Sequence, residues 1–195
     1  MNDVGIFLDR DGTVNHEVDF LTSPDNLSLL PDAARAIHEA NTLGWKVFVI
    51  TNQSGIARGL LTEPQLETIH NALRLHLRAE NATLDAIYYC PHHPDFNQLC
   101  ECRKPKTGML LQAQQEFRID LKRSYVIGDK MIDIETARNA GAYGILVLTG
   151  YGKTELELCR QNKLKIDFVA ENLYDAIQYI KQNETITTHP SHNTR

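Results

Sequence analysis

The stretch VGIFLDRDGT, residues 4–13, joins a short apolar run to two acidic residues. Val4–Leu8 is apolar throughout, which is typical of a strand that is buried on both faces of a parallel sheet. Asp9 and Asp11 follow two positions apart, so in an extended chain their side chains point to the same side. Gly12 lets the chain turn immediately afterwards. The stretch therefore predicts a buried strand that ends on a pair of carboxylates.

Short apolar runs and helical patterns alternate along the rest of the chain. Four further strands are expected at Lys46–Ile50, Ala86–Tyr89, Ser124–Ile127 and Gly144–Leu148. Helices are expected at Pro31–Leu43, 62–80, Met109–Phe117, Ile132–Ala140 and Leu173–Ile180. This alternation predicts an α/β fold, a Rossmann-like doubly wound parallel sheet with helices on both faces. We expect one domain over residues 1–183 and a polar, flexible tail over residues 184–195.

Composition and charge exclude several classes of protein. The chain has 195 residues, 42% of them hydrophobic, which is enough for one sizeable core. Its formal net charge of −5 does not attract nucleic acid or anionic lipid. No apolar run approaches the roughly 20 residues that a membrane helix needs, and the N-terminus lacks the pattern of a signal peptide. We expect a cytoplasmic monomer without nucleic-acid or membrane partners.

Polar residues suited to chemistry follow four of the expected strands. The four junctions are FLDRDGT, VITNQSG, YYCPHH and YVIGDK. In open α/β sheets ligands bind beyond the carboxyl ends of the strands, so these residues should meet at one site. The carboxylates of Asp9 and Asp11 repel each other unless a cation or a proton offsets their charge. Mg²⁺ would do so, and Asp129 at another strand end is placed to supply a third carboxylate.

Four ordered motifs carry a family resemblance. DRDGT, Thr51 in VITNQSG, Lys104 in CRKPKTG, and GDKMID resemble the motifs of the haloacid dehalogenase-like superfamily, over roughly residues 4–150. The resemblance implies a phosphatase in which Asp9 attacks phosphorus and forms an aspartyl-phosphate. Asp11 would protonate the leaving group and later activate the water that hydrolyses the intermediate.

The same resemblance implies the groups that support this chemistry. The implied Mg²⁺ ligands are the Asp9 carboxylate, the Asp11 carbonyl and Asp129. Thr51 would donate a hydrogen bond to the phosphoryl oxygens, and Lys104 would place a positive charge beside them. Asp133 either supports these groups from behind or only belongs to the first turn of a helix, and we favour the supporting role.

A second candidate site lies in CPHHPDFNQLCEC, residues 90–102, which holds three of the four cysteines. A Cys-x-His pair and a Cys-x-Cys pair supply four ligands that suit tetrahedral Zn²⁺. The expected ligands are Cys90, His92, Cys100 and Cys102, with His93 as the competing imidazole. A disulfide is the alternative, which a reducing cytoplasm disfavours. Cys159 lies far off in a helical pattern and is not expected to be a ligand.

This loop narrows the resemblance to the zinc-bearing branch of histidinol phosphatases and heptose bisphosphatases, in which the zinc is structural. The pair Arg103–Lys104 follows the last cysteine directly, as in that branch. ITNQSGIARG and GDK are more similar to the heptose bisphosphatases. The implied reaction is removal of the 7-phosphate from D-glycero-D-manno-heptose 1,7-bisphosphate, with histidinol phosphate as the alternative substrate. A catalytically silent zinc-binding module is a further hypothesis, although every motif residue is present.

The residues expected to contact substrate surround these motifs. They are Glu17, Val18, Asp19, Phe20, Asn52, Gln53, Ser54, Arg58, Arg103, Lys104 and Lys130. Arg58, Arg103 and Lys130 would give a second phosphate cationic partners, although Arg58 is also consistent with a loop surface charge. The family usually has Tyr-Val where this chain has Phe20–Leu21, so one hydroxyl is missing. No insertion is long enough for a large cap domain.

Overall fold

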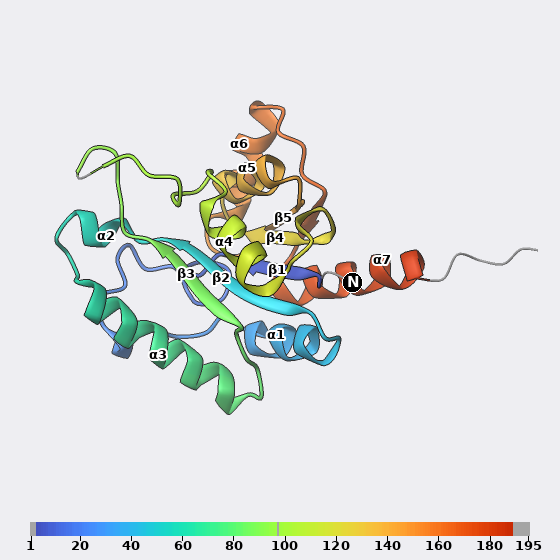
Figure 1. Cartoon of the computed structure of the whole chain (residues 1–195), viewed down its shortest axis with the longest axis horizontal. Coiled ribbons are helices and arrows are strands. Elements are labelled where there is room, and N and C mark those ends of the chain that lie inside the picture. Colours follow the sequence, from blue (N-terminus) through green and yellow to red (C-terminus); the bar gives the residue numbers. More distant parts are fainter. Residues whose placement is uncertain (1–2, 97, 189–195) are drawn as a thin grey trace, which may run out of the picture.

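The computed structural model describes residues 3–96 and 98–188 and contains one six-stranded sheet (Figure 1). The strands are β1 (Gly5–Leu8), β2 (Lys46–Asn52), β3 (Ala86–Cys90), β4 (Tyr125–Gly128), β5 (Tyr143–Val147) and β6 (Phe168–Ala170). Their order is β3-β2-β1-β4-β5-β6, and every neighbouring pair is parallel. The direction of winding changes between β1 and β4, which in such sheets is where ligands bind.

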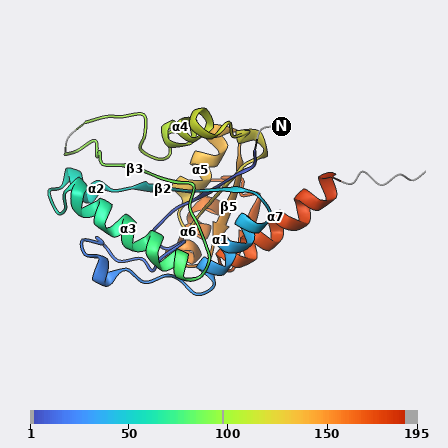
Figure 2. The same cartoon turned by 60° about the horizontal axis from the view of Figure 1, so that its bottom comes forward.

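Helices cover both faces of the sheet (Figure 2). They are α1 (Ala33–Thr42), α2 (Ser54–Ala57), α3 (Glu63–Ala79), α4 (Gly108–Phe117), α5 (Met131–Ala140), α6 (Gly152–Gln161) and α7 (Leu173–Thr188), with 3-10 turns at Pro24–Asn26 and Leu121–Arg123. Val49 on β2 packs in the cluster formed with α1, α3 and α7, whereas Phe48 packs in the cluster formed with α4. Because both residues are fully buried, β2 needs an unbroken apolar sequence.

The expected α/β fold is confirmed, and the five expected strands are present with ends shifted by one or two residues. Strand β6 was not expected, because three residues at a sheet edge carry no clear periodic signal. Helices α2 and α6 were also absent from the expected set. Within the described residues, the connections from β1 to α1 and from β3 to α4 form no cap domain.

Helix α7 is longer than its apolar pattern predicts, because it continues past Ile180 to Thr188. Glu184, the first residue of the expected tail, accepts hydrogen bonds from Arg123 Nη2 at 3.1 Å and from Tyr125 Oη at 3.0 Å. These contacts attach Glu184 to the domain, and the helix continues from there to Thr188. Residues 189–195 of the expected tail lie outside the described residues.

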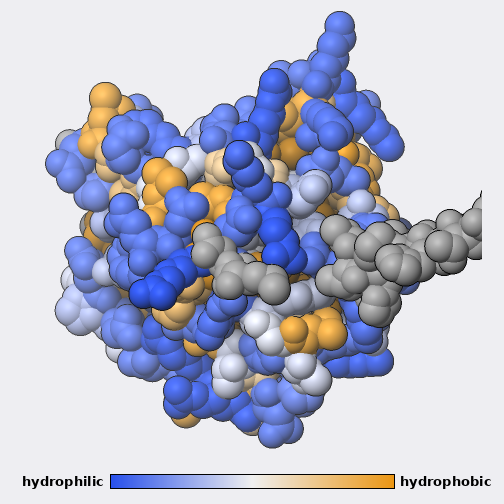
Figure 3. Space-filling view, turned by 45° about the vertical axis from the view of Figure 1, so that its right-hand side comes forward, coloured by the Kyte–Doolittle hydropathy of each residue, from blue (hydrophilic) through white to orange (hydrophobic). Residues whose placement is uncertain are grey.

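On the face of the molecule that Figure 3 shows, hydrophobic residues do not join into one large patch. Polar residues predominate there, and hydrophobic residues form small separate patches. In the part of the chain that the structure describes, no helix combines the length and the apolar character needed to cross a bilayer.

Candidate active site

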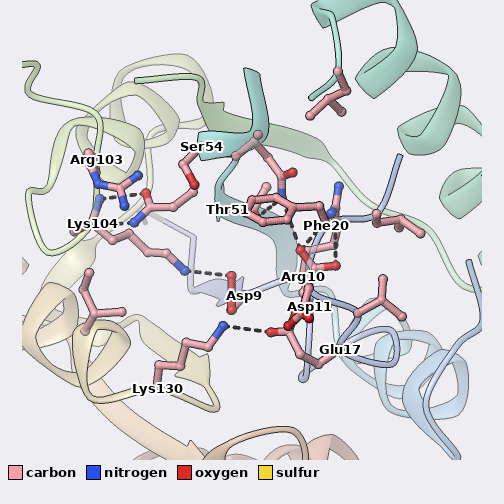
Figure 4. Close-up of a pocket in the computed structure, with 18 residues that line it drawn as sticks. Asp9, Arg10, Asp11, Glu17, Phe20, Thr51, Ser54, Arg103, Lys104 and Lys130 are labelled. Atoms are coloured by element: carbon pink, nitrogen blue, oxygen red, sulfur yellow. Dashed lines mark hydrogen bonds and ion pairs between the residues drawn. The ribbon is translucent and has the colours of Figure 1, made fainter. Parts of the chain in front are cut away.

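A pocket of about 290 Å³ lies at the carboxyl ends of β1, β2 and β4 (Figure 4). Its wall is formed by residues 9–11, 17–21, 51–55, Leu61, Arg103, Lys104, Lys130 and Ile132. All the residues expected to act in catalysis or to bind substrate line this pocket, except Arg58. The sheet topology has therefore brought four separate motifs to one place.

Lys104 is the buried cation of the site. Its Nζ donates to Asp9 Oδ1 at 2.8 Å and to Asp133 Oδ1 at 2.6 Å (Figure 4 shows the first contact). Burial alone would lower the pKa of Lys104, but the charges of Asp133 and Asp9 outweigh burial and raise it to about 12. Asn52, at the end of β2, accepts from the Lys104 N–H at 3.0 Å and donates to its carbonyl at 3.2 Å. Lys104 is thus a fixed positive charge beside Asp9.

Asp129 follows β4 and is fully buried, and among the described residues one of its two oxygens has a hydrogen-bond partner. Oδ2 accepts from the Tyr151 N–H at 2.8 Å, whereas Oδ1 has no hydrogen-bond partner among the described residues. Gly12 and Gly150 approach so closely that a Cβ at either position would overlap the Asp129 carboxylate. Burial, and after it the charge of Asp9, raises the pKa of Asp129 to about 8. A carboxylate in this position requires a cation or a proton.

The residues present fit a divalent cation. Asp9, Asp129 and Asp133 bring carboxylate oxygens within 4.8 Å of one another. Such hard oxygen donors suit Mg²⁺, and the unpartnered Asp129 Oδ1 gives it a ligand. Both oxygens of Asp133 are already occupied, because Oδ1 accepts from Lys104 and Oδ2 accepts from the Lys130 N–H at 3.2 Å. Asp133 thus lies behind Lys104 and also caps the first turn of α5, so both expected positions are present and its supporting role stays a prediction.

Asp11 is held by four hydrogen bonds. Arg10 donates through Nε to Oδ1 at 3.0 Å and through Nη2 to Oδ2 at 2.7 Å. Asn15 donates to Oδ1 at 2.9 Å, and Gln53 donates to Oδ2 at 3.2 Å. Burial would raise the pKa of Asp11, but the charge of Arg10 and these hydrogen bonds outweigh burial and lower it. The carboxylate is therefore ionised and fixed in orientation.

Two of these partners were not predicted from the sequence. Arg10 is fully buried and Asn15 is almost so. The sequence did contain a signal for Arg10, because a cation that stands directly between two aspartates at the end of an apolar strand is close to both carboxylates. No pattern in the sequence marks Asn15, because its contact depends on the turn that starts at Gly12. Gln53, which was expected to contact substrate, also donates to Thr51 Oγ1 at 2.8 Å.

Charged residues form the rim of the pocket, and one aromatic ring lies beside them. Figure 4 shows Lys130 and Glu17 pointing toward each other, and Lys130 Nζ donates to Glu17 Oε2 at 2.8 Å. Lys130 also lies 4.8 Å from the centre of the Tyr151 ring. Burial raises the pKa of Glu17 even though Lys130 opposes the shift. Arg103, also in the wall, donates through Nη1 to the His92 carbonyl at 3.0 Å.

Arg58 does not reach the pocket. Its guanidinium lies 4.3 Å from the centre of the Phe96 ring and 5.9 Å from that of Phe20. Phe96 belongs to the stretch of residues 90–102 that holds three cysteines, called the cysteine-rich loop below, whereas Phe20 belongs to the pocket wall. Arg58 thus lies between these two loops and outside the residues that line the pocket, and its expected contact with substrate stays a prediction.

The four expected zinc ligands lie together at the start of the connection from β3 to α4. Cys90, His92, Cys100 and Cys102 have ligand atoms that all lie within 4.8 Å of one another. The sulfur of Cys90 is 3.1 Å from that of Cys102 and 3.5 Å from that of Cys100, far beyond the roughly 2.05 Å of a disulfide. His92 Nδ1 is 3.4 Å from the Cys102 sulfur. Three thiols and one imidazole at these separations fit tetrahedral Zn²⁺.

His92, and not its neighbour His93, faces the sulfur atoms. His93 Nδ1 accepts from the Asp95 N–H at 3.2 Å, and its ring meets that of Phe96 edge-on at 5.2 Å. The second ring nitrogen of His92 lies 2.8 Å from the side-chain amide of Gln98. Such a partner orients an imidazole for metal binding.

Comparison with known proteins gives a consistent result. Residues 101–176 match a family model described as "HAD-hyrolase-like", for haloacid dehalogenase-like hydrolases. The chain is 41% identical over 184 residues to the D-glycero-D-manno-heptose-1,7-bisphosphate 7-phosphatase of Thermosynechococcus vestitus, covering 90% of this chain and 94% of that protein. It is 40% identical to D-glycero-beta-D-manno-heptose-1,7-bisphosphate 7-phosphatase of Escherichia coli K12, covering 92% and 94% of the two chains. The crystal structure of D,D-heptose 1,7-bisphosphate phosphatase from B. bronchiseptica, complexed with magnesium and phosphate, superposes with a TM-score of 0.84 at 37% identity, covering 92% of this chain and 99% of the other.

Proposed function

The chain belongs to the haloacid dehalogenase-like hydrolases, within them to the family of D-glycero-D-manno-heptose-1,7-bisphosphate 7-phosphatases, and we propose that it removes the 7-phosphate of D-glycero-D-manno-heptose 1,7-bisphosphate. The buried ion pair of Lys104 with Asp9 carries the proposal. A lysine that is buried between two carboxylates is costly for stability alone, whereas it suits a site for a transferring phosphoryl group.

Asp9 is the nucleophile in this mechanism. A carboxylate oxygen of Asp9 bonds to phosphorus while the bond from phosphorus to the sugar oxygen breaks, which gives an aspartyl-phosphate. Lys104, 2.8 Å from Asp9 Oδ1, offsets the negative charge that accumulates on the phosphoryl oxygens. Thr51, buried at the end of β2, donates a hydrogen bond from its hydroxyl to the same oxygens.

Asp11 moves the protons in both half-reactions. It gives a proton to the departing sugar alkoxide and later takes one from the water that attacks the aspartyl-phosphate. The lowered pKa of Asp11 keeps its carboxylate ionised, which suits the second of these steps. For the first step, a bound phosphate places further negative charge near Asp11 and thereby raises its pKa.

Asp9, Asp129 and the Asp11 carbonyl would hold Mg²⁺, which the similar phosphatase from B. bronchiseptica contains together with phosphate. When bound, Mg²⁺ neutralises charge so that an anionic carboxylate can approach an anionic phosphate. Asp129 is suited to this task because its buried Oδ1 lacks another partner among the described residues.

The cysteine-rich loop would hold Zn²⁺ in a structural role. Three thiolates and one imidazole fill a tetrahedron, which leaves no coordination position for a reacting water. Cys102 stands two residues before Lys104, so a metal bound by this loop would also fix the backbone of the catalytic lysine.

The second phosphate of the substrate is bound at the rim. Lys130 and Arg103 line the pocket and are cations that a 1-phosphate would pair with. Lys130 now pairs with Glu17, so phosphate binding would exchange one anionic partner for another. Val18, Asp19, Phe20 and Ser54 complete the wall toward the sugar.

Phosphate release with Mg²⁺ tests the proposal. Purified protein should hydrolyse the α and β anomers of the heptose bisphosphate far faster than histidinol phosphate. A preference for histidinol phosphate would assign the chain to the other substrate. No release from any phosphomonoester would favour the silent zinc-binding module.

We also propose that the working unit is a cytoplasmic monomer. Hydrophobic residues form only small separate patches on the face shown in Figure 3, which supports a monomer. The free thiols of the cysteine-rich loop support a reducing compartment.

A further inference from the structure

Arg10 is a fully buried cation to which the mechanism above gives no task. It is the largest of the fully buried side chains, and its acidic partner among the described contacts is Asp11. A buried guanidinium is costly unless it is paired and hydrogen-bonded, and an apolar residue at the same place would normally be cheaper. Its presence directly behind the proposed proton donor therefore needs an explanation.

The other end of the guanidinium contacts a buried histidine. Arg10 Nη1 lies 3.4 Å from Nε2 of His70, a 1% exposed residue of α3. Burial, and after it the charge of Arg10, lowers the pKa of His70 to about 3, so its ring is neutral and Nε2 can accept from Arg10. The ring also packs against Tyr89 of β3, with centroids 5.8 Å apart. Arg10 is thus braced by two elements of the core.

The geometry fixes both oxygens of Asp11. The Arg10 fork donates once to each oxygen, which defines the plane of the carboxylate as well as its position. Asn15 and Gln53 add one donor each, but single amide donors on separate loops do not define that plane as closely. The Asp11 side chain remains 16% exposed and lines the pocket, so the oriented group faces the substrate.

We propose that Arg10, braced by His70, is a positioning residue that orients the Asp11 carboxyl group for proton transfer to the leaving group. The inference rests on the proposed phosphatase function. Arg10 belongs to the pocket wall, but its side chain is fully buried and its guanidinium donates to Asp11, so we expect its effect on catalysis to pass through Asp11.

Substrates with different leaving groups separate this role from a general structural one. A sugar alkoxide needs a proton to leave, whereas 4-nitrophenolate does not. In a reaction through aspartyl-phosphate, kcat/KM reports only the steps up to departure of the leaving group. Arg10→Met should therefore lower kcat/KM for the heptose bisphosphate about 100-fold, the usual cost of a misplaced catalytic group. For 4-nitrophenyl phosphate the loss should stay below about 5-fold, because proton donation contributes little there.

Conservative variants show whether charge or geometry matters. Arg10→Lys keeps the charge but not the fork, so its kcat/KM for the heptose bisphosphate should lie nearer to Arg10→Met than to wild type. His70→Leu removes the brace and should reduce the same constant about 10-fold, with the same sparing of 4-nitrophenyl phosphate. His70→Gln keeps an acceptor and should recover most of the loss. Tyr89→Phe is the matched control: it keeps the ring beside His70, loses only the hydroxyl contact with Glu63, and should change neither rate.

A double-mutant cycle with the heptose bisphosphate tests separately whether Arg10 acts through Asp11. In single turnovers, Arg10→Met should cost nothing further in an Asp11→Asn background, since the group that Arg10 orients is gone. Equal losses on both substrates, or a full additional loss in the Asp11→Asn background, would overturn the proposal. If Arg10→Met does not fold, Arg10→Lys and His70→Leu decide the same comparisons. Failure of the proposed function looks different, because wild type would then release no phosphate from the heptose bisphosphate.

Discussion

Replacing Asp129 with Asn should stabilise the metal-free protein while it abolishes phosphatase activity. In the folded protein the pKa of Asp129 is raised from 3.8 to about 8, first by burial and then by Asp9. A raised pKa means that folding disfavours the charged form of an acid. The penalty is therefore absent below about pH 4, grows as the pH rises, and is complete above about pH 8. Asn carries no charge at any of these pH values, so the variant does not have this penalty on its folding free energy.

The size of the effect follows from the two pKa values. Between 3.8 and about 8, at about 1.4 kcal/mol for each pH unit, the limit is about 6 kcal/mol at high pH. Burying an amide in place of the acid costs about 1–3 kcal/mol, so we expect a net gain of about 3 kcal/mol near pH 8. For a chain of this length that corresponds to a rise in Tm of about 6–12 °C. Mg²⁺ should stabilise only the wild type, with an affinity about 50-fold weaker near pH 6 than near pH 8, because it must displace the Asp129 proton.

Thermal unfolding with EDTA and with Mg²⁺, at about pH 6 and about pH 8, measures these quantities. Glu157→Gln is the control for simple charge loss, because its carboxylate is exposed and pairs with Arg160 on the same helix. Its Tm should change by no more than about 2 °C. A less stable Asp129→Asn protein in EDTA near pH 8, or an Mg²⁺ effect that does not change with pH, would refute the reasoning.

Asp9→Asn should reduce phosphate release at least about 10³-fold with an unchanged fold by circular dichroism, and near-normal turnover would end the aspartyl-phosphate mechanism. Cys100→Ser should lose one zinc per chain by metal analysis and should be less active even with saturating Mg²⁺. Wild-type protein treated with mild EDTA and then Mg²⁺ should regain its activity while its zinc stays bound. Full activity of a zinc-free protein would contradict the structural role. Lys130→Ala should reduce kcat/KM for the bisphosphate about 10-fold more than for a heptose 7-monophosphate. Arg58→Ala, outside the pocket, should affect both substrates equally, and a selective loss there would place Arg58 at the second phosphate.

The parts of the site that follow strand ends could be predicted from the sequence. Asp9, Thr51 and Asp129 each come directly after or at the end of an apolar run, and parallel strands bring such positions to one edge of the sheet. The zinc ligands could be predicted because their spacing is local and few residue types bind Zn²⁺. In both cases a particular residue type stands at a position, a strand end or a short spacing within one loop, that can be recognised without knowledge of the tertiary packing.

The partners of the site residues could not be predicted, because they depend on tertiary packing. Asn52 was expected to contact substrate, yet its amide holds the backbone of Lys104. Arg58 has the charge to bind phosphate, but its guanidinium lies over Phe96 on another loop. The buried setting of Arg10 depends on His70, which lies 60 positions further along the chain. No periodicity or motif connects residues at such separations.

The distribution of charge explains why this site needs a divalent cation rather than another side chain. Two of its carboxylates already have a cationic partner, since Asp11 pairs with Arg10 and Glu17 pairs with Lys130. Asp9 and Asp133 share the ammonium of Lys104, and the Asp129 carboxylate lies close to both, so three carboxylates lie around one ammonium. The two remaining negative charges equal the charge of one Mg²⁺ ion, and Asp129 offers the oxygen that lacks a partner. A further lysine would pair with Asp129 and occupy the oxygen that now lacks a partner, whereas a divalent ion would supply positive charge to the carboxylates and to an incoming phosphate together.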